Sequence, residues 1–131
     1  MELEFYENVN ENYSNDSIFC LKNFSKEELN KLSAEVDNLI EGRSHINLSD
    51  LNYINNVTKK TLVLRTGVEN KGIIKINEDA YECILGKTQY IEMKEIIRRL
   101  TANETEMTSG YNWLYNAAAD IDFLLSYDGS W

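Results

Sequence analysis

Residues 60–85, with the sequence KTLVLRTGVENKGIIKINEDAYECIL, decide the fold class of this chain. β-Branched and alternating apolar residues predict three strands, at Lys60–Thr66, Gly72–Asn77 and Ala80–Leu85. Asn70 and Gly72 can take the positive φ that a tight turn between the first two strands requires. Because both connections are too short for a parallel crossover, the stretch predicts an antiparallel meander.

An amphipathic helix is predicted upstream, over residues 26–41. Ser25 and Glu28 have the spacing of a capping box, in which each side chain accepts a hydrogen bond from the backbone of the other residue. Gly42 is typical of a left-handed residue that ends a helix. The apolar residues between them recur at helical spacing: Leu29, Leu32, Val36, Leu39 and Ile40.

A second helix is predicted downstream, over residues 89–100, with Thr88 as its N-cap. Residues 111–118 are rich in aromatic residues and alanine and are interpreted as a short third helix. Residues 120–126 and Ser17–Lys22 are predicted strands, and a short edge strand is expected near the N-terminus, around Leu3, Phe5 and Val9.

These elements predict a single α+β domain over residues 1–131, with two main helices packed on one antiparallel β-sheet. The chain contains no run of about 20 apolar residues that could span a membrane. Its first residues lack the basic and apolar regions of a signal peptide, so we expect a cytoplasmic protein.

The chain is acidic, with a net charge of −9 and a pI of about 4.6. Residues 1–58 carry a net −7 and residues 101–131 a net −5, whereas residues 59–100 carry a net +3. Negative charge repels phosphate backbones and anionic lipid surfaces, which disfavours direct nucleic-acid and membrane binding. It attracts basic partners and accelerates association with them, although acidity can equally serve solubility alone.

The residues available for catalysis are few. His45 is the only histidine, and the two cysteines, Cys20 and Cys83, lie in alternating apolar stretches that are typical of buried thiols. Their spacing predicts no metal site, and no motif indicates a cofactor. We therefore expect no enzymatic activity, although a small enzyme that uses carboxylates or Cys83 stays open as an alternative.

Acidic and aromatic residues together indicate two candidate surfaces for binding a protein partner, because aromatic anchors inside an acidic rim suit a basic partner. The first is near the C-terminus and consists of Tyr111, Asp120, Asp122, Tyr127, Asp128 and Trp131. The second is on the middle strands and consists of Glu69, Glu78, Asp79 and Glu82. Burial of the aromatic residues in the core is the competing interpretation.

The last part of the chain, from about residue 62, resembles small bacterial immunity proteins of polymorphic toxin systems, including contact-dependent growth inhibition. The segments that carry the resemblance are LVLRTGVENKGI (62–73), GYNWLY (110–115) and FLLSYDGSW (123–131). The resemblance implies a cytoplasmic protein that binds a cognate toxin, often a basic nuclease, and neutralises it. A phage-type acidic inhibitor and an adaptor protein are the other binding functions that the sequence leaves open.

Overall fold

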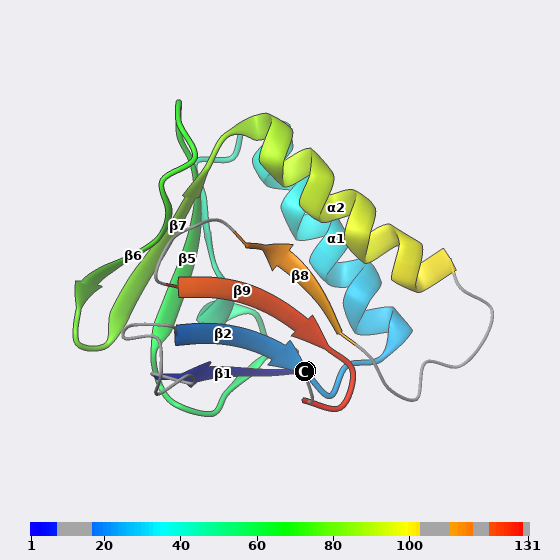
Figure 1. The fold of residues 1–131 in the computed structure, drawn as a ribbon. Helices are drawn as coiled ribbons and strands as arrows, with labels where there is room; N and C mark the ends of the chain where they lie inside the picture. Colours follow the sequence, from blue (N-terminus) through cyan, green and yellow to red (C-terminus); the bar gives the residue numbers. More distant parts are fainter. Residues whose placement is uncertain (8–16, 103–110, 117–120, 130–131) are drawn as a thin grey trace.

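The computed structural model describes residues 1–7, 17–102, 111–116 and 121–129, which form two mixed β-sheets and two long helices (Figure 1). The elements in chain order are β1 (Glu2–Tyr6), β2 (Ser17–Lys22), α1 (Lys26–Ile40), β3 (His45–Asn47), a 3-10 helix (Leu48–Asp50), β4 (Asn55–Asn56), β5 (Thr61–Thr66), β6 (Gly72–Asn77), β7 (Ala80–Leu85), α2 (Lys87–Ala102), β8 (Tyr111–Tyr115) and β9 (Ile121–Ser126). The α+β class is therefore confirmed.

The five-stranded sheet has the order β4-β1-β2-β9-β8. β1 and β2 are antiparallel, as are β8 and β9, but β2 and β9 run parallel although they lie at opposite ends of the chain. The predicted N-terminal strand exists, but it is not an edge strand, because the short β4 pairs with its outer side. Val9, which was included in that prediction, lies outside the described residues.

The four-stranded sheet has the order β3-β5-β7-β6, so the predicted single antiparallel sheet and antiparallel meander are wrong. β5 and β7 are parallel neighbours, and β6 lies antiparallel beyond β7. The five residues 67–71 between β5 and β6 can extend over about 16 Å. That length exceeds two strand spacings, about 10 Å, so the loop can pass the end of β7 and place β6 on the far side of that strand.

The helix α1 is set by its own sequence, as predicted. The Ser25 side chain accepts from the Glu28 N–H at 3.1 Å, and the Glu28 carboxylate accepts from the Ser25 N–H at 2.9 Å. At the other end the Gly42 N–H donates to Leu39 O and the Arg43 N–H donates to Asn38 O. These two hydrogen bonds form a Schellman motif, which requires the positive φ of 122° at Gly42.

The helix α2 begins at Lys87, so the prediction of Thr88 as its N-cap is wrong. The carbonyl of Gly86 accepts the N–H groups of Gln89 and Tyr90 and thereby starts the helix. Residues 111–115 form strand β8 instead of the predicted helix. The predicted helix covered eight residues, 111–118, of which 117 and 118 lie outside the described residues. A helix that short is only marginally stable by itself, and the hydrogen-bond ladder with β9 outweighs it.

One cluster of buried side chains joins both sheets and both helices. The Tyr81 ring of the four-stranded sheet lies 4.9 Å from the Phe5 ring and 5.1 Å from the Phe19 ring of the five-stranded sheet. The hydroxyl of Tyr90, on α2, lies 2.9 Å from the carbonyl oxygens of Arg65 and Cys83 and so ties that helix to β5 and β7. In the part of the chain that the structure describes, no helix is long and apolar enough to cross a membrane.

Candidate protein-binding face

The five-stranded sheet has two different sides. Its inner side, which includes Leu3, Phe19 and Phe123, belongs to the main core, and Figure 1 shows the two helices together behind it. Because side chains alternate along a strand, the intervening residues point to the opposite side. We call that side the outer face; it consists of Glu2, Glu4, Tyr6, Ile18, Cys20, Lys22, Tyr111, Trp113, Asp122, Leu124 and Ser126.

The strand register arranges these side chains in three rows that cross the sheet. The rows are Glu2–Lys22–Ser126–Tyr111, then Glu4–Cys20–Leu124–Trp113, then Tyr6–Ile18–Asp122. Neighbours in a row are about 5 Å apart, and successive rows are about 7 Å apart. Acidic and aromatic residues therefore surround a short apolar centre.

The apolar centre is a second small cluster of its own. Ile18, Cys20 and Leu124 are at most 4% exposed, and Tyr6 and Trp113 pack against them. Side chains are buried on both sides of the sheet formed by β1, β2, β9 and β8, and this packing fixes the arrangement of the four strands. The polar groups around the apolar centre therefore lie on a rigid base.

Lys22 is the one cation among the described residues of the outer face. Its Nζ lies 3.1 Å from a Glu4 carboxylate oxygen, 2.9 Å from the Tyr6 hydroxyl and 5.5 Å from the centre of the Tyr6 ring. The hydrogen bond to Tyr6, together with the Glu4 carboxylate, raises the pKa of Lys22 above its ordinary value. A hydrogen bond with Tyr6, followed by the Lys22 ammonium, lowers the pKa of Glu4. Both groups therefore stay charged at neutral pH.

Tyr111 is the most exposed aromatic residue of this face. Its side chain is 48% exposed, and its ring meets the Trp113 ring nearly edge to face, with centroids 6.1 Å apart. Trp113 is only half-buried, but it packs on the apolar centre. Tyr111 is therefore the aromatic side chain of this face that is most open to solvent, and the Trp113 ring beside it packs on the apolar centre.

The predicted C-terminal group is only partly brought together. Tyr111 and Asp122 share the outer face, and Asp128 is exposed in the adjoining turn, where Gly129 lies against the Lys22 side chain. Tyr127 instead packs perpendicular to Phe24, with ring centroids 5.8 Å apart. Asp120 and Trp131 lie outside the described residues.

Sequence reasoning missed the contribution of β1 to the outer face. Alternation along residues 2–6 does place Glu2, Glu4 and Tyr6 on one side of a strand. Only the pairing of β1 with β2, and of β2 with β9, brings that side next to Asp122 and Tyr111.

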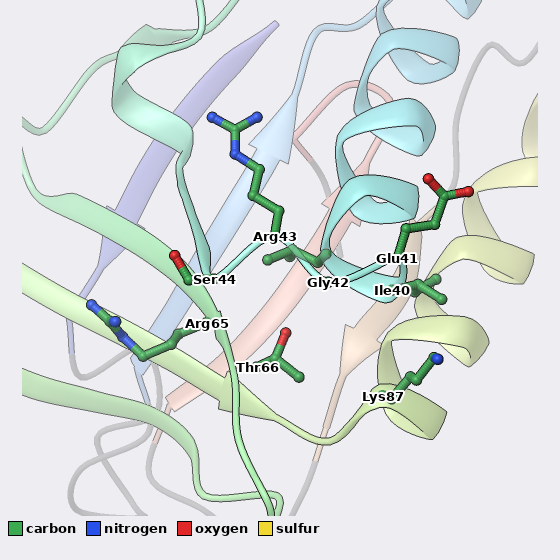
Figure 2. Close-up of a pocket in the computed structure, with 9 residues that line it drawn as sticks. Ile40, Glu41, Gly42, Arg43, Ser44, Arg65, Thr66 and Lys87 are labelled. Carbon is green, nitrogen blue, oxygen red and sulfur yellow. The ribbon is translucent and has the colours of Figure 1, made fainter.

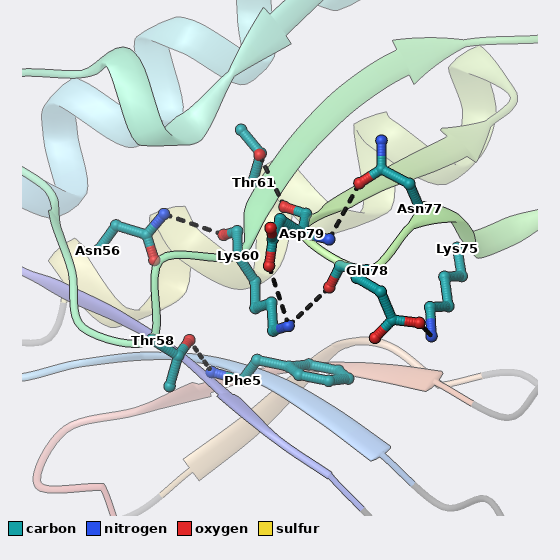
Figure 3. Close-up of polar contacts among 9 residues, drawn as sticks. All are labelled: Phe5, Asn56, Thr58, Lys60, Thr61, Lys75, Asn77, Glu78 and Asp79. Carbon is teal, nitrogen blue, oxygen red and sulfur yellow. Dashed lines mark hydrogen bonds and ion pairs between the residues drawn. The ribbon is translucent and has the colours of Figure 1, made fainter.

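The second predicted group does not form one acidic patch. Glu69 lies in the β5–β6 loop, whereas Glu78 and Asp79 lie in the β6–β7 turn at the other end of β6. Figure 3 shows how the latter turn is held: Lys60 reaches the Glu78 carbonyl and the Asp79 carboxylate, and Lys75 pairs with the Glu78 carboxylate at 3.0 Å.

Glu82, the fourth member of that group, pairs with Arg65 at 3.1 Å. Three of the four carboxylates therefore have a cation beside them, and this region is close to neutral. Its charge is therefore more nearly balanced than that of the outer face.

Cys83 and His45 lie on opposite sides of the four-stranded sheet. Cys83 pairs in register with Leu64, which pairs with Ile46, so these three point to the core side of the four-stranded sheet. His45 is one residue removed from Ile46 and lies on the other side, exposed. Burial raises the pKa of both Cys20 and Cys83 to about 12, so both thiols are protonated at neutral pH.

The pockets that the described residues line are open to solvent. Figure 2 shows one of about 430 Å³ beside the end of α1, where the side chains of Arg43, Arg65 and Lys87 point apart instead of converging. Arg43 and Arg65 are engaged with Glu35 and Glu82. Within the described residues, no three His, Cys, Asp or Glu side chains are grouped so that they could hold a metal ion.

Comparisons with protein-family models, with curated proteins and with solved structures gave no match to this chain.

Proposed function

We propose that this protein binds a basic protein partner and, as an immunity protein of a bacterial toxin system, neutralises it by forming a stoichiometric complex in the cytoplasm. The observation that supports a binding function is the outer face of the five-stranded sheet. Three carboxylates, three aromatic side chains and a single ammonium group lie there on a rigid base. The toxin-neutralising role rests on the resemblance of residues 62–131 to immunity proteins.

The geometry favours binding over catalysis because of how the reactive groups are placed. The thiols are buried and protonated, and Glu4, Glu28 and Glu82 each have a cation within 3.1 Å. A carboxylate that acts as a general base is instead expected to be poised near neutral pH. Acidic groups on the outer face suit electrostatic steering towards a basic protein such as a nuclease toxin.

The test is co-expression with the protein encoded by the adjacent gene. We expect that protein to stop growth when it is produced alone, and this chain to restore growth and to co-elute with it in a fixed ratio. A neighbour that is harmless and does not co-elute would refute the toxin-neutralising role.

A small enzyme that depends on carboxylates or on Cys83 is the alternative function. It requires turnover of a substrate that is lost in a Cys83→Ala or carboxylate variant which remains folded. If Cys83→Ala also restores growth in the co-expression assay as well as the parent chain does, the thiol has no part in the function.

A further inference from the structure

The outer face differs in charge from the rest of the described sheet surface. Glu2, Glu4 and Asp122 on the face, with Asp128 in the adjoining turn, give four carboxylates against the single ammonium of Lys22. On the four-stranded sheet, by contrast, Arg65 pairs with Glu82 and Lys60 with Asp79. Between the two described sheets, the outer face is therefore the more acidic surface.

We propose that the outer face is the docking surface for the basic protein partner, with Tyr111 as its anchor; this inference rests on the proposed function. The partner supplies lysine or arginine side chains that meet Glu2 and Asp128. It also supplies a recess, lined by apolar or guanidinium groups, that receives the Tyr111 ring.

Charge decides among the possible occupants of this face. A second copy of the chain would bring four carboxylates against four carboxylates, which repel one another. An anionic lipid surface or a nucleic acid would be repelled for the same reason. A basic protein is the occupant that the charges attract.

The size of the face defines the extent of the interface. Four strands and five residues along each strand span about 14 Å by 14 Å, or about 200 Å². Less than that area is open to a partner, because Ile18, Cys20, Leu124 and Ser126 are buried. A stable complex buries about 800 Å² on each partner, so the face forms the centre of the interface and the partner must extend beyond it. The turn that contains Asp128 adjoins the face and adds a negative charge to this wider interface.

Tyr111 is suited to the anchor position because its surroundings already fix its orientation. The Trp113 ring supports it from one side, and Trp113 itself is held on Leu124 and its neighbours. A side chain that is ordered before binding loses little conformational freedom in the complex, which favours a large contribution to affinity. Trp113 and Tyr6 are positioning residues, since they cover the apolar centre.

The experiment measures binding of the co-purified partner to variants by a surface-based kinetic assay. We expect Tyr111→Ala to weaken affinity at least about 10-fold, mainly through faster dissociation. Glu2→Lys and Asp128→Lys should slow association several-fold at low ionic strength, and this effect should fade as salt is raised. Matched controls outside the face, Ile76→Ala and Glu69→Lys, should bind as the parent does.

The outcomes separate the inference from the proposed function. If the complex forms but the control variants weaken it while the face variants do not, the docking surface is wrong and the proposed function stands. If no complex forms with the parent chain, both are refuted. A short oligolysine peptide provides a second probe: we expect its amide chemical-shift changes on β1, β8 and β9, and changes confined to β5–β7 would contradict the inference.

Discussion

Glu28 makes two contacts that connect helix α1 to the start of the chain. One carboxylate oxygen accepts the Ser25 N–H at 2.9 Å, and the other lies 2.5 Å from the Met1 ammonium group. The Met1 side chain is fully buried, its ammonium is partly buried and also donates to the Tyr53 carbonyl at 3.2 Å, and the Glu28 side chain is 23% exposed. Glu28→Gln keeps an acceptor for the cap but removes the charge that faces the ammonium.

We expect Glu28→Gln to lower the free energy of unfolding by about 2 kcal/mol. Hydrogen bonds to charged groups contribute about 1.5–3 kcal/mol, and the exposed part of Glu28 places this pair below a fully buried one, whose disruption costs about 3–5 kcal/mol. For a chain of this length the melting temperature should fall by about 8 °C.

Urea unfolding at neutral pH, on protein with an unmodified N-terminus, is the measurement. Glu27→Gln is the control, because it removes the same charge from the same helical turn. The Glu27 side chain is 82% exposed, and its ion pair with Lys31 is long, at 3.8 Å. The control should cost at most about 0.5 kcal/mol beyond the shared helix-dipole effect. If the two variants differ by less than about 0.5 kcal/mol, the Met1–Glu28 pair does not stabilise the fold.

The pH dependence gives an independent check of the same pair. Burial raises the pKa of Glu28, but the hydrogen bonds from the Met1 ammonium and Ser25 together outweigh it, so the pKa lies below the ordinary 4.5. A lowered pKa in the folded state means that the stabilisation is complete above 4.5 and is lost as pH falls through the folded-state pKa. The difference between parent and Glu28→Gln should therefore shrink in acid.

Three further perturbations follow from the packing. Tyr90→Phe should cost about 1–3 kcal/mol in urea unfolding while the fold is kept, because two carbonyl groups lose their bond to the buried hydroxyl. Gly67→Ala should cost about 1–3 kcal/mol, since its Cβ would lie 2.6 Å from the Ile84 Cγ2; an Ile84→Ala background should reduce that cost, and an unchanged cost would contradict the clash. Because burial raises the pKa of Cys20 and Cys83 to about 12, an aromatic disulfide reagent at pH 8 should react only as fast as the chain unfolds, and immediate reaction of the folded protein would show an accessible thiolate.

The sequence by itself determined most of the elements and the side of each that is buried. The strands Ser17–Lys22, Gly72–Asn77 and Ala80–Leu85 have the predicted bounds, and α1 begins at the predicted cap. Period-two alternation also puts Tyr81, Cys83 and Leu85 on one side of their strand, and the structure buries that side in the core. These features depend on residues that are close in the chain, so local propensity, capping and periodicity are enough to predict them.

Only the tertiary structure decided which strands pair, and therefore which side chains meet. Alternation tells which face of a strand is apolar but not which strand lies beside it, so β7 between β5 and β6, and β9 beside β2, could not be derived. The same limit applies to the outer face, where Glu2 and Tyr111 share a row although they lie at opposite ends of the chain. Pairing is settled by hydrogen-bond ladders and by packing on both sides of a sheet, and these involve residues that are distant in sequence.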